Sequence, residues 1–439
     1  MSQIFRPLLD QHTNLYSQVL DNIIGVHKST YFDYTASGLA YKTIEDRVQE
    51  VLQTYANTHS KDALMSATTD TYYRQAREHL KTLLELDENF AILPSGCGAT
   101  ASLKRLQEIL GVYIPPATKD RYELIDKSSL PLVIVGPYEH HSNEVSYREA
   151  LCDIIRINIK KDGLIDLDHL RQVLKANKER EIIGSFCIAS NVTGIITPYE
   201  EISNLLREYN AIVCFDAATS SPYINIDCNL YDAMVFSPHK LLGGPGSCGL
   251  LAIRKKLINN NFPPTFAGGG TVSYVSRKSH TFVSELEDRE DAGTPGILQL
   301  IRATLAYQLR NELGLEWIKN KKTQLYSYLK RELSFIQEIK CYGCDHVNNI
   351  GIVALNINNV DPYKLCTYLS YEKNFHTRAG CSCAGPYGHD LLNLEDNEEI
   401  NKNVKNKPGW LRISLHYSHN IQTIDTLVAS IKQYLKSVN

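Results

Sequence analysis

Six short apolar runs rich in β-branched residues recur between residues 131 and 253. They are PLVIVG (131–136), CDIIRINI (152–159), EIIGSFCIAS (181–190), AIVCFDA (211–217), DAMVFS (232–237) and CGLLAI (248–253). Helical patterns such as LDHLRQVLKANKE and YEEISNLLREY separate several of them. Strands that alternate with helices predict an α/β fold, an open and mostly parallel sheet with helices on both faces. Ligands of such sheets bind beyond the carboxyl ends of the strands, so the residues after each run are candidate site residues.

The pattern changes after AGGGTVSYVS (267–276). A long helical stretch over 296–334 precedes a strand-like run at 350–357, a helix near 361–371, the run WLRISLHY (410–417) and a final helix from about 421. A chain of 439 residues exceeds what one simple core holds. We therefore predict a large domain over 30–295 and a smaller α+β domain built from 1–29 and 296–439. The polar segment 393–409 is predicted to be a surface loop.

The composition excludes several classes of protein. A net charge of -3 gives no reason to expect a nucleic-acid or anionic-membrane partner. No window reaches the run of about 18 apolar residues that a membrane span needs, and the N-terminal residues do not resemble a signal peptide. Eleven scattered cysteines are typical of a reduced cytoplasmic protein, in which we expect most cysteines to be small core residues.

Polar side chains follow two neighbouring predicted strands. Asp216 ends one run, and the turn SPHK after the next run holds Ser237, His239 and Lys240. A lone aspartate at a strand end is often only solvated, and a lysine is often a surface amine. A lysine beside histidine and serine can also be a nucleophilic amine with a lowered pKa.

Two glycine-rich sequences compete as phosphate-binding loops. PSGCGATASLKRL (94–106) follows a strand-like run and opens an amphipathic helix, so its amides and Thr100 can meet an anion. GPGSCG (244–249) runs into a strand, which is the wrong context for a phosphate loop. Neither is followed by the βαβ unit and acidic residue of a nicotinamide site, so a dehydrogenase is disfavoured.

Two further strand ends contribute His140, His141 and Asn191. One edge of the predicted sheet thus collects a helix start, an imidazole, an amide, a carboxylate and a lysine. This set suits pyridoxal phosphate, with the phosphate on the helix start, the aspartate on the pyridinium nitrogen and the lysine as the Schiff-base amine.

The chain resembles the cysteine-desulfurase-like members of the class V aminotransferases, which are fold type I pyridoxal-phosphate enzymes. Ten segments occur in the order of that family. They are YFDYTASG (31–38), SGCGATAS (95–102), EHHSN (139–143), SNVTG (190–194), FDAAT (215–219), SPHKLLGGPG (237–246), GGGTV (268–272), AGTP (292–295), RAGCSCA (378–384) and WLRISLHY (410–417).

The resemblance assigns roles to individual residues. It implies Lys240 as the Schiff-base lysine, Asp216 on the ring nitrogen, His140 on the ring face and Asn191 near the ring hydroxyl. The remaining implied cofactor contacts are Ala99, Thr100, Ser237 and His239 on the phosphate, and Thr271 and Thr294 reaching across a homodimer. Thr219 stands where desulfurases commonly have a glutamine. For the substrate carboxylate the resemblance implies Arg412, with Arg378 as a second candidate and a surface ion pair as its alternative.

The stretch RAGCSCAGPYGH (378–389) carries two cysteines one residue apart. The family pattern R-x-G-x-x-C places Cys383 at the nucleophile position, whereas Cys381 has no assigned role. Three alternatives stay open: packing of both thiols, a strained disulfide between them, and a zinc site. The zinc site would add Cys341, Cys344 and His389, but C-x-C is not the usual knuckle spacing.

These observations predict a cysteine desulfurase or a cysteine/selenocysteine lyase. Lys240 would take the Cα proton of the amino acid, and Cys383 would take its sulfur as a persulfide and release alanine. L-cysteine or an analogue is the expected substrate, with a sulfur-accepting protein as a further partner class and no metal. The alternatives are an aminotransferase or other C–S lyase in which Cys383 is incidental, and a non-enzymatic scaffold.

Overall fold

The computed structural model describes residues 2–10, 13–58, 60, 62–122, 129–344, 348–395 and 407–438. Its central feature is a seven-stranded sheet in the order β3-β9-β8-β7-β6-β4-β5. The strands are β3 (Phe90–Ser95), β4 (Leu132–Val135), β5 (Asp153–Arg156), β6 (Ile182–Cys187), β7 (Ile212–Asp216), β8 (Ala233–Phe236) and β9 (Gly249–Arg254). Only β9 runs antiparallel to its neighbours, so the mostly parallel sheet predicted from the apolar runs is confirmed.

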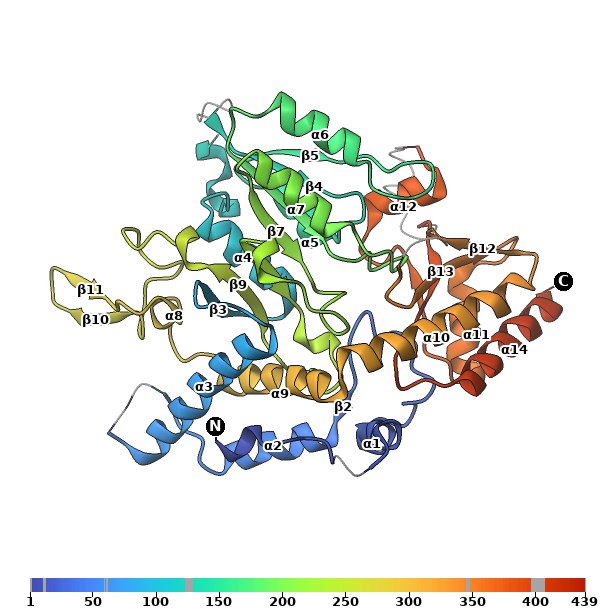
Figure 1. Cartoon of the computed structure of the whole chain (residues 1–439), viewed down its shortest axis with the longest axis horizontal. Helices are drawn as coiled ribbons and strands as arrows, with labels where there is room; N and C mark the ends of the chain where they lie inside the picture. The colour runs from blue at the N-terminus through green and yellow to red at the C-terminus, as the bar shows by residue number, and fades with distance from the viewer. Residues whose placement is uncertain are drawn as a thin grey trace.

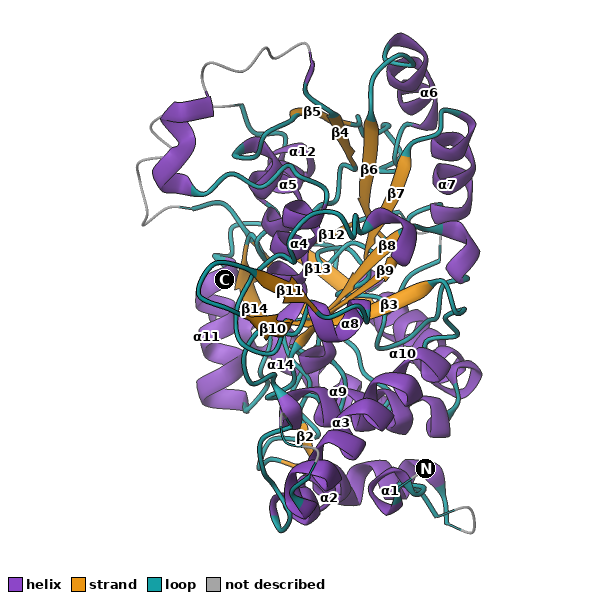
Figure 2. Cartoon of the chain, turned by 90° about the vertical axis from the view of Figure 1, so that its left-hand side faces the viewer, coloured by secondary structure: helices purple, strands orange, loops and turns teal. Residues whose placement is uncertain are grey.

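Successive side chains of a strand belong to two different hydrophobic clusters. In β4, Leu132 and Ile134 belong to one cluster and Val133 and Val135 to the other. Side chains of a strand alternate between the two faces, and both faces of this sheet are covered, which explains the nearly unbroken apolar runs. Figure 2 shows the strands enclosed by helices.

The helices of the large core lie on opposite faces of the sheet. The first face packs against residues of α2 (Lys42–Leu52), α3 (Leu64–Leu83), α6 (Leu167–Ala176), α7 (Tyr199–Glu208) and α9 (Ile297–Leu313). The second face packs against α4 (Gly98–Ile109), α5 (His141–Arg148) and the short α8 (Leu286–Arg289).

A second, four-stranded sheet has the order β12-β13-β15-β14 and is antiparallel throughout. Its strands are β12 (Ile339–Tyr342), β13 (Ile352–Ile357), β14 (Arg378–Gly380) and β15 (Trp410–Ser414), and β14 is an edge strand. Its own core is shared with α10 (Leu315–Ser334), α11 (Pro362–Lys373) and α14 (Ile421–Val438). Figure 1 shows this smaller α+β unit at the right of the view.

The helical stretch predicted over 296–334 is two helices. Helix α9 ends before Gly314 and α10 begins after it, because Gly314 adopts a positive φ of 85°, which glycine reaches without steric cost. Helix α9 is buried in the core of the large sheet, whereas the buried face of α10 enters the core of the small one. Ile4, Phe5 and Leu8 also join the large core. The boundary at 295–296 stays a prediction, and this packing favours a division after α9 instead.

Two small strand pairs and two short helices lie outside these units. Strands β1 (Ile23–Ile24) and β2 (Ala40–Tyr41) form one ribbon, and β10 (Val272–Val275) and β11 (His280–Phe282) form a hairpin that projects at the left of Figure 1. Helix α1 (Leu15–Asn22) precedes β1, and α12 (Gly385–Leu392) follows the Cys383 segment. Most of the predicted loop 393–409 lies outside the described residues.

The described helices include none that is long and apolar enough to cross a membrane. Every one of the eleven cysteines lies within the described residues and is a free thiol, so Cys381 and Cys383 form no disulfide. Four cysteines are buried, and five partly buried ones pack against the hydrophobic cores: Cys152, Cys341, Cys344, Cys366 and Cys381. Most cysteines therefore contribute to core packing, as expected, whereas Cys97 is exposed and Cys383 lines the cavity described below.

Candidate active site

A cavity of about 220 Å³ lies at the carboxyl ends of the parallel strands. Twelve of the residues predicted from the sequence line it: Ala99, Thr100, His140, Asn191, Asp216, Thr219, Ser237, His239, Lys240, Arg378, Cys383 and Arg412. The expectation that the strand ends converge on one site is confirmed, because parallel strands bring their carboxyl ends to the same edge.

The start of α4 is the part of the cavity whose backbone amides could meet an anion. The Cys97 side chain at the N-cap makes no capping hydrogen bond, so the first amides of the helix depend on other partners. Ala99 N donates to Ser237 Oγ at 2.8 Å. A Cβ built on Gly98 would lie 2.9 Å from His239 Cε1, so only glycine lets the helix start approach the lysine turn this closely. The Thr100 hydroxyl lies 2.7 Å from Ser142 Oγ.

Lys240 and Asp216 come from neighbouring strands, with Lys240 in a short 3-10 turn (Pro238–Lys240) after β8. Burial lowers the pKa of Lys240 to about 8, although Asp216 partly offsets the effect. Burial raises the pKa of Asp216, against the opposing effects of the Ala218 amide and Lys240. Ala218 N donates to Asp216 Oδ1 at 2.8 Å. The site therefore holds an amine that is easily deprotonated beside a buried carboxyl group.

His140 and His239 are neutral at pH 7. Burial and the nearby Lys240 lower the pKa of each to about 4. His140 caps α5, and its Nδ1 accepts from Ser142 N at 3.1 Å, which leaves the ring proton on Nε2. A neutral imidazole can lie against the face of an aromatic ring without adding charge to the site.

Behind His140, the Glu139 carboxyl group is buried beneath the sheet edge. It accepts from Asn143 Nδ2 at 2.6 Å and from Cys187 N at 2.9 Å. Burial raises the pKa of Glu139 to about 8. Its hydrogen bonds fix the EHHSN segment against β6 and so hold His140 in place.

The Cys383 segment is an irregular turn that follows edge strand β14. Ser382 and Cys383 have φ values of 55° and 58°, left-handed conformations that are costly for residues with a side chain. Three hydrogen bonds hold the turn: Asn191 Nδ2 to Ser382 O at 2.6 Å, His141 N to Cys383 O at 2.8 Å and Gly385 N to His141 Nε2 at 2.8 Å. Cys383 thus lines the cavity on a segment that two other strand ends position.

Three polar atoms of cavity-lining residues lack partners among the described residues. Asn191 Oδ1, Ser382 Oγ and Arg412 Nε are buried without a hydrogen bond. A buried polar group without a partner is costly, and such groups in a cavity commonly meet a ligand. An amide oxygen, a guanidinium, an open helix start, a buried carboxyl group and a lysine fit an anionic ring cofactor together with a carboxylate.

Thr271 and Thr294 are the two predicted residues that do not line this cavity. Thr271 Oγ1 donates to Gly268 O at 2.8 Å, and Thr294 Oγ1 accepts from Asn57 Nδ2 at 3.1 Å. Both belong to the arm over 262–296 that carries the projecting hairpin. Their reach into a partner's site stays a prediction.

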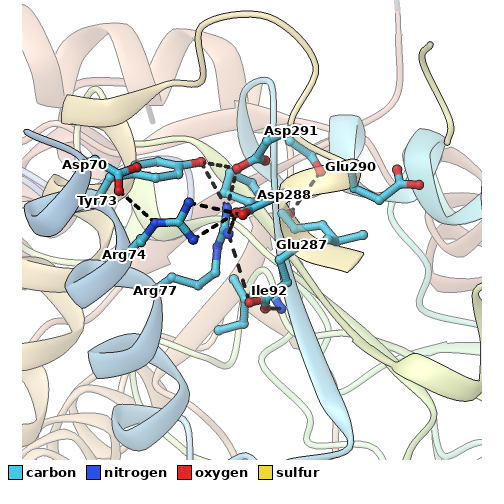
Figure 3. A network of polar contacts seen from close by, with 12 residues as sticks. Asp70, Tyr73, Arg74, Arg77, Ile92, Glu287, Asp288, Glu290 and Asp291 are labelled. Atoms are coloured by element: carbon cyan, nitrogen blue, oxygen red, sulfur yellow. Dashed lines mark hydrogen bonds and ion pairs between the residues drawn. The ribbon is translucent and has the colours of Figure 1, made fainter. Parts of the chain in front are cut away.

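A polar network anchors this arm to the large domain, as Figure 3 shows. Arg74 bonds both oxygens of Asp288, at 3.2 and 3.1 Å. Arg77 pairs with Asp291, which also accepts from Tyr73 Oη at 2.9 Å. Glu287 accepts from Ile92 N at 2.7 Å and so satisfies the outer edge of β3. These contacts fix α8 and Asp291 just after it, between Thr271 and Thr294.

Several residues of the site were missed by the sequence analysis. Thr35, Ala36, Cys97, Tyr138 and Ser382 also line the cavity. Thr35 and Ala36 belong to YFDYTASG, a segment that matched the family but does not follow a strand of the large sheet. The order of the family segments could have pointed to them, whereas the strand-end rule could not. The described residues contain no group of three or more His, Cys, Asp or Glu side chains placed to hold a metal, which disfavours the zinc alternative.

Comparisons with known proteins agree with this geometry. Two relatives are each named probable cysteine desulfurase. The protein from Pyrococcus abyssi is 26% identical over 422 residues and covers 93% of this chain and 94% of the relative. The protein from Streptomyces coelicolor is 24% identical over 368 residues and covers 82% and 84%.

Solved structures show the same fold. An apo cysteine desulfurase from Thermococcus onnurineus NA1 has a TM-score of 0.82 at 22% identity, covering 97% of this chain and 99% of that one. The Escherichia coli cysteine desulfurase CsdA (S-sulfonic acid) has a TM-score of 0.78 at 20% identity, with the same coverage. The family model described as aminotransferase class V matches residues 30–427. The chain therefore belongs to the class V aminotransferase family.

Proposed function

We propose that this protein is a pyridoxal-phosphate-dependent cysteine desulfurase. The observation that carries the proposal is that Cys383 and Lys240 line one cavity with Asp216, His140 and Asn191. A deprotonating amine and a thiol in one cavity suit the removal of sulfur from an amino acid. The names of the relatives from Pyrococcus abyssi and Streptomyces coelicolor support the same activity.

The proposed cofactor contacts follow the chemistry of the cavity. The start of α4, with Ala99, Thr100, Ser237 and His239, would hold the phosphate. Asp216 would pair with the ring nitrogen, His140 would lie on the ring face, and Asn191 and Thr219 would meet polar groups of the cofactor. When bound, pyridoxal phosphate supplies an electron sink that makes the Cα proton of an amino acid acidic.

Lys240 would move the Cα proton. Its pKa of about 8 leaves a substantial neutral fraction near pH 7, and an ordinary lysine would leave almost none. The buried Arg412 would bind the substrate carboxylate, with the partly exposed Arg378 beside it. These residues would bring the substrate into position for the thiol.

Cys383 would act as the sulfur acceptor. Its thiolate would form an S–S bond with the substrate sulfur as the substrate Cβ–S bond breaks, and the carbon fragment would keep the electron pair and leave as alanine after protonation. The sulfur stays on Cys383 as a persulfide until a thiol or an acceptor protein removes it. We further propose that the active form is a homodimer in the cytoplasm, with Thr271 and Thr294 completing the partner's site.

Mass spectrometry after incubation with L-cysteine tests this function. We expect an added mass of about 32 Da, one sulfur atom, on Cys383 together with released alanine. The adduct should vanish in Cys383→Ser and persist in the matched control Cys381→Ser. A keto-acid product without sulfide or alanine would instead identify an aminotransferase, and a protein that binds no cofactor would identify a scaffold.

A further inference from the structure

Two arginines of the cavity stand directly opposite each other on neighbouring strands. Arg378 in β14 is paired in register with Arg412 in β15. Like charges in such cross-strand positions repel each other and destabilise the pair. Arg412 is 2% exposed, so this repulsion is screened poorly by solvent at one of the two groups.

One carboxylate lies between the two guanidinium groups. Asp33 Oδ1 is 2.5 Å from Arg412 Nη2, and Asp33 Oδ2 is 3.5 Å from Arg378 Nη1. Both arginines line the cavity, whereas Asp33 is not among the lining residues. It therefore neutralises one of two positive charges without occupying the space in which a ligand would bind.

The backbone fixes this position of Asp33. Phe32 N donates to His376 O at 2.8 Å, and Ser414 N donates to Phe32 O at 2.8 Å. Residues 31–33 thus run alongside β15 and pair with it at Ser414, two positions after Arg412. The Asp33 carboxylate is held in place by the same small sheet that carries both arginines.

Apart from Asp33, the contacts of Arg412 that the described residues provide include no carboxylate. Nη1 donates to Asn191 O at 2.9 Å, while Nε is buried and lacks a partner among the described residues. Burial lowers the pKa of Arg412, and Asp33 offsets only part of that cost. The guanidinium therefore keeps the capacity to bind one more anion.

If the proposed function holds, the cofactor engages Lys240 and Asp216. The charges that remain for the amino-acid substrate can then be counted. His140 and His239 are neutral at pH 7, so the charged groups at the amino-acid end are Arg378 and Arg412, which line the cavity, and Asp33, which pairs with both. Two positive charges and one negative charge leave room for one carboxylate. A second carboxylate on the ligand would be left uncompensated.

We propose that Asp33 sets the charge of the substrate subsite, so that the enzyme accepts amino acids with one carboxylate and rejects dicarboxylic ones. Removing the Asp33 charge would leave both guanidinium groups unneutralised and would favour a doubly anionic ligand. Asp33 acts through the two arginines, so it is a specificity-determining residue and does not contact the reacting atoms.

The test compares two ligands of the pyridoxal-phosphate-loaded enzyme, L-alanine and L-aspartate, at pH 7. Their affinities are measured by calorimetry and by the absorbance of the bound cofactor. In Asp33→Asn we expect the affinity for aspartate relative to alanine to rise at least about tenfold, as expected for one uncompensated charge nearby. The double variant Asp33→Asn/Arg378→Gln restores the charge count and should return the ratio to about the wild-type value.

Asp46→Asn serves as the surface control, because Asp46 pairs with Lys42 on an exposed helix face. An unchanged ratio in Asp33→Asn, or an equal loss of affinity for both ligands, would overturn the proposal, since Asp33 would then only position Arg412. If Asp33→Asn fails to fold, Arg378→Gln alone tests the same count and should weaken aspartate more than alanine. Amino-acid binding stays measurable even if Cys383 acquires no sulfur, so failure of the proposed function is distinguishable.

Discussion

Two pairs of arginines in this protein differ in the number of carboxylates that surround them. Arg74 and Arg77 on α3 meet four acidic residues within 4.0 Å, namely Asp70, Glu287, Asp288 and Asp291. Among the described residues, Arg378 and Arg412 on the small sheet share one carboxylate, that of Asp33. Arg77 and Arg412 are both buried, so burial does not distinguish the two pairs.

The pKa values of the two buried arginines shift in opposite directions. Burial alone would lower the pKa of Arg77, but Asp291, Tyr73 and Glu287 together raise it above the usual value. Burial lowers the pKa of Arg412, and Asp33 does not fully offset it. An arginine whose charge several carboxylates offset fixes two segments to each other, whereas one that shares a single carboxylate with a second arginine keeps binding capacity for an anion. The difference separates a structural network from a binding site.

The largest effect is expected from Arg77→Met, which removes the buried guanidinium from the polar network between α3 and α8. It would leave the partly buried Asp291 without its counter-charge, while Glu287 keeps Lys81 at 3.0 Å. Breaking such a buried pair costs about 3–5 kcal/mol. We expect the free energy of unfolding to fall by that amount in urea denaturation. Arg6→Met is the matched control, because the Arg6–Glu50 pair is exposed and should cost less than about 1 kcal/mol. Equal losses in the two variants would show that the network adds no more than a surface pair.

The pH dependence of cofactor binding tests the lowered pKa of Lys240, in the cavity that Arg378 and Arg412 also line. Only the neutral amine of Lys240 can attack the cofactor aldehyde, and its pKa is lowered to about 8. Below pH 8 the neutral fraction falls about tenfold for each pH unit, so capture by the cofactor-free protein should be about 100-fold slower at pH 6 than at its plateau. Stopped-flow absorbance measures this rate. A rate that keeps rising past pH 9 would mean that the site does not lower the lysine pKa.

A smaller effect is expected from replacing Arg412 and Arg378 one at a time. Arg412→Gln should weaken L-alanine binding about 30-fold, because a buried charged hydrogen bond is worth about 2 kcal/mol or more. Arg378→Gln should weaken it only about threefold, since its side chain is 41% exposed. Calorimetric titration of the loaded enzyme gives both affinities. A larger loss in Arg378→Gln than in Arg412→Gln would reverse their proposed roles.

Much of the fold was predictable from local patterns. The six apolar runs all contain strands of the large sheet, because burial on both faces requires apolar side chains at successive positions. The break at Gly314 was missed, since helical periodicity continues on both sides of it. Edge strand β14 was also missed, because three residues, one of which is Gly380, carry no β pattern.

The candidate site was predictable where its residues follow strands. Lys240, Asp216, His140 and Asn191 were found in this way, and the family resemblance added Cys383 and Arg412. Asp33 received no role, because its partners are 345 and 379 positions away along the chain. The local sequence around residue 33 does not indicate that Asp33 will pair with two arginines.

The sequence by itself determined the alternation of strands and helices and the chemical groups at the strand ends. Both depend on periodicity and residue type, which act over a few neighbouring positions. Only the tertiary structure decided which charges are balanced. The net charge around each arginine depends on residues that distant segments bring within 4 Å, and that proximity is what separates Arg77 from Arg412.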